Sequence, residues 1–313
     1  MSKKKISVYT PCFNEEDNIE YCYSTIKNLF INSLKDYDYE HIFGDNCSED
    51  KTLVKLKEIS SKDKNVKVIS YSRNFGAFQS LYNGAISATG DAIICISADL
   101  QDPPEIIPKM VEKWENGFDV VYGKKIAREE SFIMQNIRKF YYKIVKKFSY
   151  IDIPENVGEF CLINKKVQNA IKLYDDYYPY LRGMIANCGF KRAYVEYTWK
   201  KRKFGKSTGS TYILIDNAIN GLISFSNIPM RICLFVGAII STISVCFSIY
   251  SFFVALLLPK AAQPGISLLI VAIFFFFGIT LFFLGVVGEY ISAIHSQVRK
   301  KPLVIINEKI NFD

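Results

Sequence analysis

Two runs of residues without a charged side chain lie near the C-terminus, at residues 232–258 and 266–288. Each run reaches the roughly 20 residues that an α-helix needs to cross the hydrocarbon core of a bilayer. Backbone groups inside a bilayer must hydrogen-bond within their own segment, so a run of this kind forms a helix there. A buried hairpin in a soluble core is the alternative, and the lengths of the runs favour the membrane. We therefore expect a transmembrane hairpin over residues 231–290.

Charged residues around the two runs predict their orientation. Basic residues flank the runs: Arg231 before the first, and His295, Arg299, Lys300 and Lys301 after the second. Because basic residues favour the cytoplasmic side, both termini and a tail over residues 291–313 are expected in the cytoplasm. These basic residues could also attract anionic lipid headgroups.

The N-terminal part is expected to stay in the cytoplasm as well. The opening MSKKKISVYT lacks the apolar stretch of a signal peptide. Residues 211–230 form an amphipathic stretch, which predicts a juxtamembrane helix in the membrane interface. The expected organisation is a cytoplasmic domain at residues 1–210 followed by a multi-pass anchor in the cell (inner) membrane.

Residues 1–125 alternate short apolar runs with helix-length segments. The strand candidates are residues 6–11, 39–44, 66–71, 91–98 and 119–123. This rhythm predicts an α/β domain with a mainly parallel sheet and helices on both faces. In such sheets the ligand site lies beyond the carboxyl ends of the strands. Those ends carry FNEE, GDNCSED, SRNFG and ADLQD, so we expect the polar clusters to converge.

Composition excludes several classes of function. The net charge of +8 suits nucleic acid, an anionic membrane surface or phosphate-bearing substrates, but no arginine-rich run or nucleic-acid motif supports the first. Eight scattered cysteines without a CxxC pair, and only two histidines, argue for reduced core thiols and against a zinc site. No GxGxxG follows the first strand and no GxxxxGK[ST] occurs, which excludes the common dinucleotide and P-loop sites.

The stretch ISADLQDPPE is the most informative short segment. An apolar strand ends in Asp99, Gln101 and Asp102, and Pro103 and Pro104 then prevent its continuation. Proline is tolerated at the first position of a helix, so the pair also marks a helix start. A buried strand thus delivers oxygen atoms at its tip and is then stopped.

Six segments in order resemble one family over nearly the whole chain. VYTPCFNEEDNI, GDNCSEDKT, SRNFGAFQSLYNGAISATGD and SADLQDPPE together resemble inverting family 2 glycosyltransferases of the GT-A fold. RKFGKSTGS and GVVGEYISAIHSQVRKKPLVII narrow the resemblance to the polyprenyl-phosphate branch, which includes bactoprenol glucosyltransferases and dolichol-phosphate mannose synthases. The two-helix tail is more similar to the bacterial members.

The resemblance implies an activity and its partners. The expected enzyme moves a sugar from a nucleotide-sugar, with a UDP-sugar favoured, to undecaprenyl phosphate or a similar polyprenyl phosphate. The product would be a lipid-linked sugar for modification of cell-envelope glycans. A homo-oligomer, with a tetramer favoured, is also implied, and the extended PLVII could take part in it. The identity of the sugar is not predicted.

The resemblance assigns a divalent cation, Mg²⁺ or Mn²⁺, to the turn after the fourth strand. Asp99 matches the family's metal-binding aspartate and Gln101 the amide beside it, and oxygen ligands suit such cations. Ser97 stands where the family has its first acidic residue and is expected on the donor side. Because a hydroxyl is a poorer ligand than a carboxylate, we expect weaker cation binding or a water in its place; an inactive enzyme is the alternative.

Donor-binding residues follow from the same match. The first loop, which holds base and ribose in the family, corresponds to Pro11, Asn14 and Glu15, and the second to Asp45 and Asp50. A carboxylate that stabilises a helix N-terminus is the equally weighted alternative for Asp50. Arg73 follows the third strand and either contacts the donor or pairs with a neighbouring acid.

Basic residues are expected near the diphosphate leaving group, where they stabilise negative charge. Those matching the family's phosphate-contacting stretch are Lys124, Lys125 and Arg128, and those matching the R-x-x-G-x-S element that closes over the site are Arg202 and Ser207. For Lys125 and Ser207 we expect donor contacts.

Two acids, Asp102 and Glu159, are candidates on the acceptor side. A phosphate monoester is already largely ionised at neutral pH because its second pKa is about 6. Neither acid is therefore expected to be an obligatory base. The predicted catalytic set is Asp99, Asp102, Arg128 and Arg202.

Two other functions remain open at this point. A processive polysaccharide synthase should carry a QxxRW motif and more spans, whereas QNIRK at residues 135–139 ends in lysine. A non-catalytic membrane scaffold that kept the fold would fit Ser97, and it would lack metal-dependent nucleotide binding.

Overall fold

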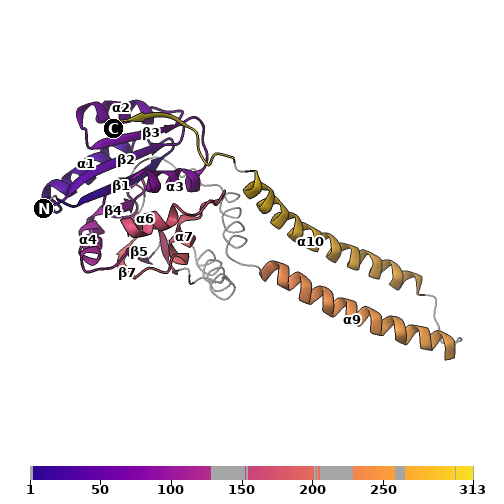
Figure 1. Cartoon of the computed structure of the whole chain (residues 1–313). Coiled ribbons are helices and arrows are strands. Elements are labelled where there is room, and N and C mark those ends of the chain that lie inside the picture. Colours follow the sequence, from indigo (N-terminus) through magenta and orange to yellow (C-terminus); the bar gives the residue numbers. More distant parts are fainter. Residues whose placement is uncertain are drawn as a thin grey trace. The chain divides into compact units, whose positions relative to one another are not determined.

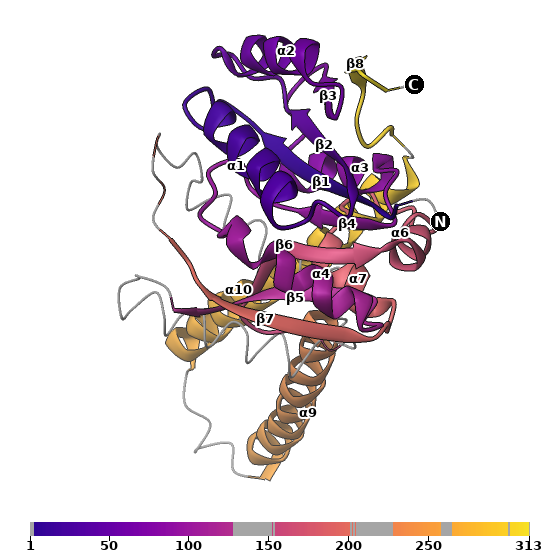
Figure 2. The same ribbon diagram turned by 90° about the vertical axis from the view of Figure 1, so that its left-hand side faces the viewer.

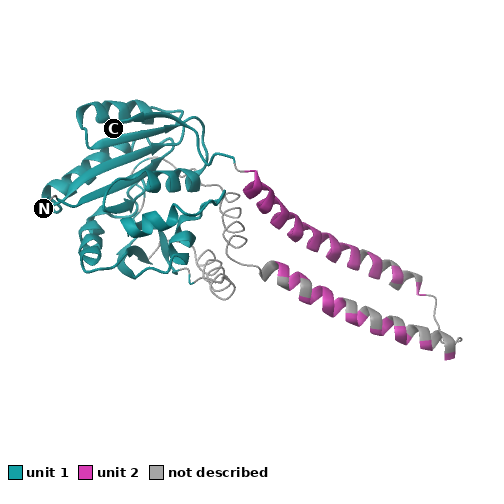
Figure 3. Cartoon of the chain, in the orientation of Figure 1, with its two compact units in different colours: residues 1–221, 301–313 teal, residues 222–300 magenta. Residues whose placement is uncertain are grey.

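The computed structural model describes residues 3–127, 152, 154–200, 202, 204, 228–257, 265–299 and 301–312. They belong to two compact units, residues 1–221 with 301–313, and residues 222–300 (Figure 3). Arg128 and Ser207 lie outside the described residues, as do QNIRK at 135–139 and residues 211–227 of the expected juxtamembrane helix.

The first unit is built on an eight-stranded sheet (Figure 1). Its strands are β1 (Lys5–Cys12), β2 (Asp38–Asp45), β3 (Val66–Tyr71), β4 (Ala92–Cys95), β5 (Val120–Ala127), β6 (Val157–Asn164), β7 (Arg192–Thr198) and β8 (Ile306–Ile310). Its helices are α1 (Ile19–Asn32), α2 (Thr52–Lys62), α3 (Ala77–Ser87), α4 (Ile107–Glu115), α6 (Lys165–Ile171) and α7 (Leu181–Asn187). Figure 2 shows the strands in their spatial order, β7-β5-β6-β4-β1-β2-β3-β8.

The expected α/β class is confirmed, and the sheet is mixed. The pairs β1–β2, β2–β3, β1–β4 and β5–β7 are parallel. The antiparallel pairs are β4–β6, β5–β6 and β3–β8. All three involve β6 or β8, which the alternation of strands and helices over residues 1–125 did not include.

Helices cover both faces of the sheet, as expected. Apolar side chains of α1, α2 and α4, such as Ile26, Leu56 and Met110, pack on one face. Those of α3, α6 and α7, such as Leu81 and Val167, pack on the other face. The central strands are buried on both faces, which explains why they read as continuous apolar runs.

The strand order places a topological switch point at the ends of β1 and β4. The chain passes from β1 to β2 through α1 on one face, and from β3 to β4 through α3 on the opposite face. The order therefore reverses between β1 and β4, and ligands of open α/β sheets bind at such a switch point. β4 ends at Cys95, and the helical turn after it begins at Pro104, as the two prolines predicted.

The C-terminal residues return to the first unit as the edge strand β8. The Ser72 N–H donates to the Ile305 carbonyl at 3.0 Å. The Asn311 side-chain amide donates to the carbonyls of Ser60 and Val66, at 2.8 Å each. The segment expected only as a tail is thus an integral part of the sheet.

The second unit contains α9 (Ile228–Leu257) and α10 (Ile266–Val298), which contact each other. α10 continues to Val298, beyond the expected end of the second span at Gly288. Within the described residues, Phe275–Val298 is long and apolar enough to cross a membrane, and none of it is buried by protein. The two-span hairpin itself stays a prediction.

Candidate active site

The carboxyl ends of the central strands bring the polar loops to one edge of the sheet. Cys12 lies opposite Asp45, and Asp45 lies opposite Ser70 in the next pair. Tyr9 of β1 lies opposite Cys95, the last residue of β4. The loops at residues 13–18, 46–51 and 72–76 and the turn at 97–102 therefore start side by side. The predicted convergence is confirmed.

Asp99 lies in a tight turn after β4. The Leu100 N–H donates to the Ser97 carbonyl at 3.3 Å, and the Gln101 N–H donates to Asp99 Oδ1 at 3.2 Å. Leu100 has a left-handed φ of 48°, which is rare for a residue with a side chain. The turn leaves the Asp99 side chain partly buried and Ser97 exposed.

Arg202 joins this turn to the first loop. Its Nη2 lies 3.1 Å from Asp99 Oδ2 and 2.7 Å from Glu15 Oε1, and its Nε lies 3.2 Å from Asp99 Oδ2. The Gln101 side-chain amide has one orientation in which both its nitrogen and its oxygen are hydrogen-bonded. In that orientation the amide nitrogen donates to Asp99 Oδ2 and the amide oxygen accepts from the Arg202 backbone N–H. These side chains are mostly buried, so the pairing is screened less than a surface ion pair. Arg202 thus lies beside Asp99 and Glu15, and its closure over a bound donor stays a prediction.

The Glu15 carboxylate is occupied by protein groups. Besides Arg202, the Asn18 side-chain amide donates to its Oε2 at 2.6 Å. Burial raises the pKa of Glu15, and the hydrogen bond from Asn18 and the charge of Arg202 oppose that rise. Glu15 therefore orients Arg202 here, and a direct contact between Glu15 and the donor stays a prediction.

Asp45 has a buried, unpaired oxygen at the end of β2. This last residue of β2 is fully buried, and its Oδ2 accepts the Ser48 N–H at 3.4 Å. Its Oδ1 has no hydrogen-bond partner, and burial raises the pKa of the carboxyl. Buried polar atoms are normally paired, so this oxygen suits a ligand that brings an N–H or O–H group.

Asn14 and Asp50 fasten the first loop to the second. The Asn14 N–H donates to Ser48 Oγ at 3.0 Å. The Asp50 carboxylate accepts the Glu16 N–H at 3.1 Å and the Thr52 N–H at 2.9 Å. Burial would raise the pKa of Asp50, but these hydrogen bonds lower it. Oδ1 of Asp50 thus binds backbone at the start of α2, as the helix-terminus alternative expects, whereas Oδ2 binds the backbone of the first loop.

Asn46, which sequence analysis did not single out, fastens the second loop to the third. It is buried, and its Nδ2 donates to Asn74 Oδ1 at 2.9 Å and to the Gly76 carbonyl at 3.2 Å. Its Oδ1 accepts the Phe75 N–H at 3.1 Å. The sequence offered one signal for Asn46: it is a polar residue directly after Asp45, where β2 ends.

Arg73 and Pro11 also lie at this edge. The Arg73 guanidinium lies 3.9 Å from the centroid of the Phe75 ring and donates to the Asn74 carbonyl at 3.0 Å. Among the described residues no carboxylate pairs with Arg73, so the acid-pair alternative gains no support. Pro11 is the second-last residue of β1.

The acceptor-side candidates meet at the ends of β5 and β6. The Lys125 ammonium lies 3.0 Å from Asp102 Oδ1, and Asp102 is buried. Burial raises the pKa of Glu159, which the charges of Arg182 and Lys125 oppose. Lys124 instead pairs with exposed Glu196 at 3.1 Å. Lys125, rather than Lys124, therefore belongs to the site.

Comparisons with known proteins identify the family of this chain. The model of the family described as Glycosyl transferase family 2 matches residues 7–171, more than half of the chain. The chain belongs to glycosyltransferase family 2. The bactoprenol glucosyl transferase of Shigella phage SfV is 34% identical over 307 residues, 97% of this chain and 99% of that protein.

Other relatives match over similar lengths. The prophage bactoprenol glucosyl transferase homolog of Escherichia coli K12 is 34% identical over 96% of this chain and 98% of that protein. An uncharacterized glycosyltransferase of Synechocystis is 34% identical over 97% and 95%. The family 2 chain is thus similar to these proteins along its whole length, including the second unit.

A solved structure supports the fold. Glucosyl-3-phosphoglycerate synthase from Mycobacterium tuberculosis, crystallised with Mn²⁺, UDP and phosphoglyceric acid, has a TM-score of 0.50 and 18% identity, covering 71% of this chain and 78% of that chain. The fold of this family 2 transferase is accordingly the GT-A fold.

The residues of the turn fit a divalent cation that a substrate helps to hold. Among the described residues, no group of three or more His, Cys, Asp or Glu side chains is placed to hold a metal ion. Asp99 provides one carboxylate, with the Gln101 amide and the Ser97 hydroxyl in the same turn. Mg²⁺ is commonly bound by one or two carboxylates, with waters and substrate phosphates completing its shell. This donor set suits such a shared cation rather than a closed protein cage.

Proposed function

We propose that this chain is an inverting glycosyltransferase that moves a sugar from a UDP-sugar to undecaprenyl phosphate or a similar polyprenyl phosphate. The observation that carries the proposal is the Asp99–Arg202–Glu15 group at the switch point of a GT-A sheet. Whole-length similarity to bactoprenol glucosyl transferases supports the choice of acceptor.

The donor would bind across the three fastened loops. The unpaired, buried Oδ1 of Asp45 would accept a hydrogen bond from the base or ribose. Asp99 and Gln101 would hold Mg²⁺ or Mn²⁺, which would supply positive charge to the diphosphate. Arg202, within reach of the same turn, would add positive charge as the leaving group departs.

The acceptor would need positioning more than activation. A phosphate monoester with a second pKa of about 6 is mostly a dianion at neutral pH. Lys125, expected from the sequence to contact the donor, lies mostly buried between Asp102 and the Trp199 ring. We therefore place it on the acceptor side, where it would attract that dianion together with Arg128. A phosphate oxygen of the acceptor would attack the anomeric carbon of the donor sugar. The bond between that carbon and UDP would break at the same time, which inverts the configuration at the anomeric carbon. Asp102 and Glu159 would shape the charge around the acceptor without having to remove a proton.

A membrane setting suits an acceptor that cannot leave the bilayer. Phe275–Val298 can cross a membrane by length and composition. We extend this to two spans, at residues 232–258 and 266–288, with the catalytic unit and both termini in the cytoplasm. The homo-oligomer belongs to the same proposal.

A transfer assay tests the function. The purified full-length chain in detergent is given undecaprenyl phosphate, Mn²⁺ or Mg²⁺, and a panel of labelled UDP- and GDP-sugars. Label is expected to enter the organic phase with one UDP-sugar, and to stay in water when EDTA is present. No transfer with any donor, and no metal-dependent UDP binding by the folded protein, would indicate the inactive scaffold instead.

Asn46→Ala is expected to weaken UDP binding about tenfold and to lower the free energy of unfolding by about 1–2 kcal/mol, because the Phe75 N–H and the Asn74 amide lose buried partners. Calorimetric titration with UDP and Mn²⁺ measures the first effect. Asn187→Ala is the control, because the Asn187 amide bonds the Tyr174 hydroxyl in an exposed position away from the three loops. Equal UDP affinity in the two variants would contradict the role of Asn46.

A further inference from the structure

The turn that carries Asp99 and Gln101 needs support from outside. Leu100 has a left-handed φ of 48° and is buried. A non-glycine residue in this region is strained by roughly 1–3 kcal/mol and persists only where its surroundings hold it. Groups on neighbouring elements must therefore hold this turn after β4.

Contacts to the turn come from β7 and the residues after it. The Tyr197 hydroxyl donates to Asp102 Oδ1. The Lys200 N–H donates to the Gln101 carbonyl at 3.0 Å. Arg202 follows with its contacts to Asp99. The segment from Tyr197 to Arg202 therefore contacts three residues of the turn: Asp99, Gln101 and Asp102.

The Tyr197 hydroxyl is rigidly placed. The side chain is 4% exposed, and its ring packs edge-on against Phe160 with centroids 5.8 Å apart. Gly123 makes room for both rings, because a Cβ there would lie 2.9 Å from each of them. A buried ring held in this way offers one direction for its hydroxyl, and that direction is Asp102.

Asp102 receives its two donors from paired residues. Lys125 of β5 and Tyr197 of β7 lie opposite each other in the parallel pair, and both reach Asp102 Oδ1. Lys125 has a long flexible chain and also faces the Trp199 ring. Tyr197 is the stiffer of the two supports.

We propose that Tyr197 is a positioning residue for the cation-binding turn: its hydroxyl fixes Asp102, and through Asp102 it sets Asp99 and Gln101 against Arg202. The inference rests on the proposed function, since it concerns the same cation and donor. It adds to that function a residue on β7 that touches neither the sugar nor the phosphates.

Removing only the hydroxyl should loosen the turn and spare the fold. In Tyr197→Phe the ring still fills its place, and Asp102 keeps Lys125. The turn would then spend part of its time in other arrangements, and the apparent dissociation constant rises by the inverse of the competent fraction. We expect about a tenfold weaker Mn²⁺ affinity in the presence of UDP, from a competent fraction of about one tenth.

The test measures Mn²⁺ binding directly. Free Mn²⁺ is followed by electron paramagnetic resonance during titration of the full-length chain in detergent with UDP, for wild type, Tyr197→Phe and Tyr194→Phe. Tyr194 is the matched control: it lies on the same strand, is 38% exposed and stacks on Tyr122. The dissociation constant should rise about tenfold for Tyr197→Phe and stay at the wild-type value for Tyr194→Phe.

Kinetics separate positioning from a general structural defect. At saturating Mn²⁺ the kcat of Tyr197→Phe should return to near the wild-type value, whereas a general structural defect would keep kcat low at every Mn²⁺ concentration. Unchanged Mn²⁺ affinity in Tyr197→Phe, with normal binding by wild type, would overturn the inference and leave the proposed function intact. No Mn²⁺-dependent UDP binding by wild type would overturn both.

A second variant guards against misfolding of the first. Asp102→Asn keeps the shape of the side chain and changes the acceptor of the same hydrogen bond. It should also weaken Mn²⁺ binding, and the double variant with Tyr197→Phe should be no weaker than Asp102→Asn alone, because both act through one contact. Additive losses would overturn the inference.

Discussion

Asp99→Ala is expected to abolish most sugar transfer, with kcat/KM falling by about a thousandfold, the upper end of the range seen when one charge-stabilising group is removed. The variant loses the carboxylate that would bind the cation. It also leaves Arg202 paired with Glu15 alone, so the guanidinium is drawn toward the first loop. The measurement is label transfer to polyprenyl phosphate over a range of donor concentrations.

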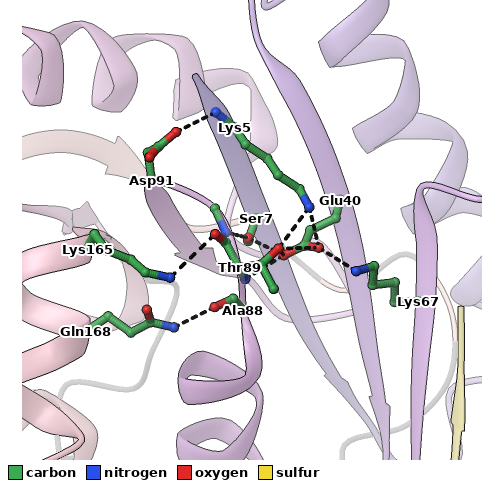
Figure 4. Close-up of polar contacts among 10 residues, drawn as sticks. Lys5, Ser7, Glu40, Lys67, Ala88, Thr89, Asp91, Lys165 and Gln168 are labelled. Carbon is green, nitrogen blue, oxygen red and sulfur yellow. Dashed lines mark hydrogen bonds and ion pairs between the residues drawn. The ribbon is translucent and has the colours of Figure 1, made fainter. Parts of the chain in front are cut away.

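Two matched variants test whether the loss is specific to Asp99. Asp102→Asn should lose only about tenfold, because it keeps the side-chain shape and is not required as a base. Asp91→Asn should keep the wild-type kcat/KM. Asp91 directly precedes the first residue of β4, at the end of the strand away from Asp99, and accepts the Lys5 N–H at 2.8 Å (Figure 4). Equal, mild losses in Asp99→Ala and Asp102→Asn would contradict the assignment of Asp99.

Glu40→Ala is expected to lower the free energy of unfolding by about 3 kcal/mol, within the range for breaking a buried charge pair. Glu40 is 1% exposed and lies near the start of β2, whereas Asp45 lies at the other end of that strand. Figure 4 shows the polar contacts around it. Its oxygens accept from Ser7 Oγ at 2.6 Å, the Thr89 N–H at 2.8 Å, Lys5 at 2.9 Å and Lys67 at 3.0 Å. The Thr89 hydroxyl donates to the same carboxylate at 2.9 Å, and alanine would leave all of these donors without this acceptor.

The same carboxylate makes stability depend on pH. Burial would raise the pKa of Glu40, but hydrogen bonds from Ser7, Lys5, the Thr89 backbone and Lys67 lower it to about 2. The unfolded value is about 4.3. The contribution of Glu40, about 3 kcal/mol, is therefore full above the unfolded value and lost as the pH falls from about 5 toward 2. Glu40→Gln should flatten stability in that window.

Tryptophan fluorescence during urea unfolding measures both effects, because Trp114 and Trp199, the two tryptophans of the chain, lie in the first unit. Glu115→Ala is the control. Glu115 pairs with Lys4 at the surface, where an ion pair contributes about 1 kcal/mol or less. A Glu40→Ala variant as stable as Glu115→Ala would show that the buried network does not stabilise the sheet.

Sequence patterns predicted the parts of the fold that depend on local order. β1 to β4 alternate with helices, so their parallel pairing and common edge followed from the chain itself. β6 and β8 join the sheet antiparallel, and the pairs β6–β4 and β8–β3 join strands that lie far apart in sequence; β8 follows an apolar helix. Pairing over such distances is decided by packing, which a local pattern does not contain.

In the candidate site, too, some residues could be predicted from the local sequence and others could not. Asp99, Gln101 and Asp45 stand at strand ends, where polar residues after an apolar run are conspicuous. The pairing of Arg202 with Asp99 spans 103 positions and depends on the tertiary fold. Tyr197 reads as an ordinary core residue of an alternating strand, and only its hydroxyl contact with Asp102 distinguishes it. Asn46 is a neutral amide whose three partners lie in another loop.

The most direct test of the central claim is the chemical state of the lipid phosphate after turnover. Phosphorus-31 NMR of undecaprenyl phosphate, incubated with the full-length chain, the UDP-sugar found in the assay and Mn²⁺, should show the monoester converting to a sugar phosphodiester as UDP is released. Undecaprenol under the same conditions should stay unmodified. Release of UDP and free sugar with the lipid monoester unchanged, or transfer to a hydroxyl acceptor, would contradict the account.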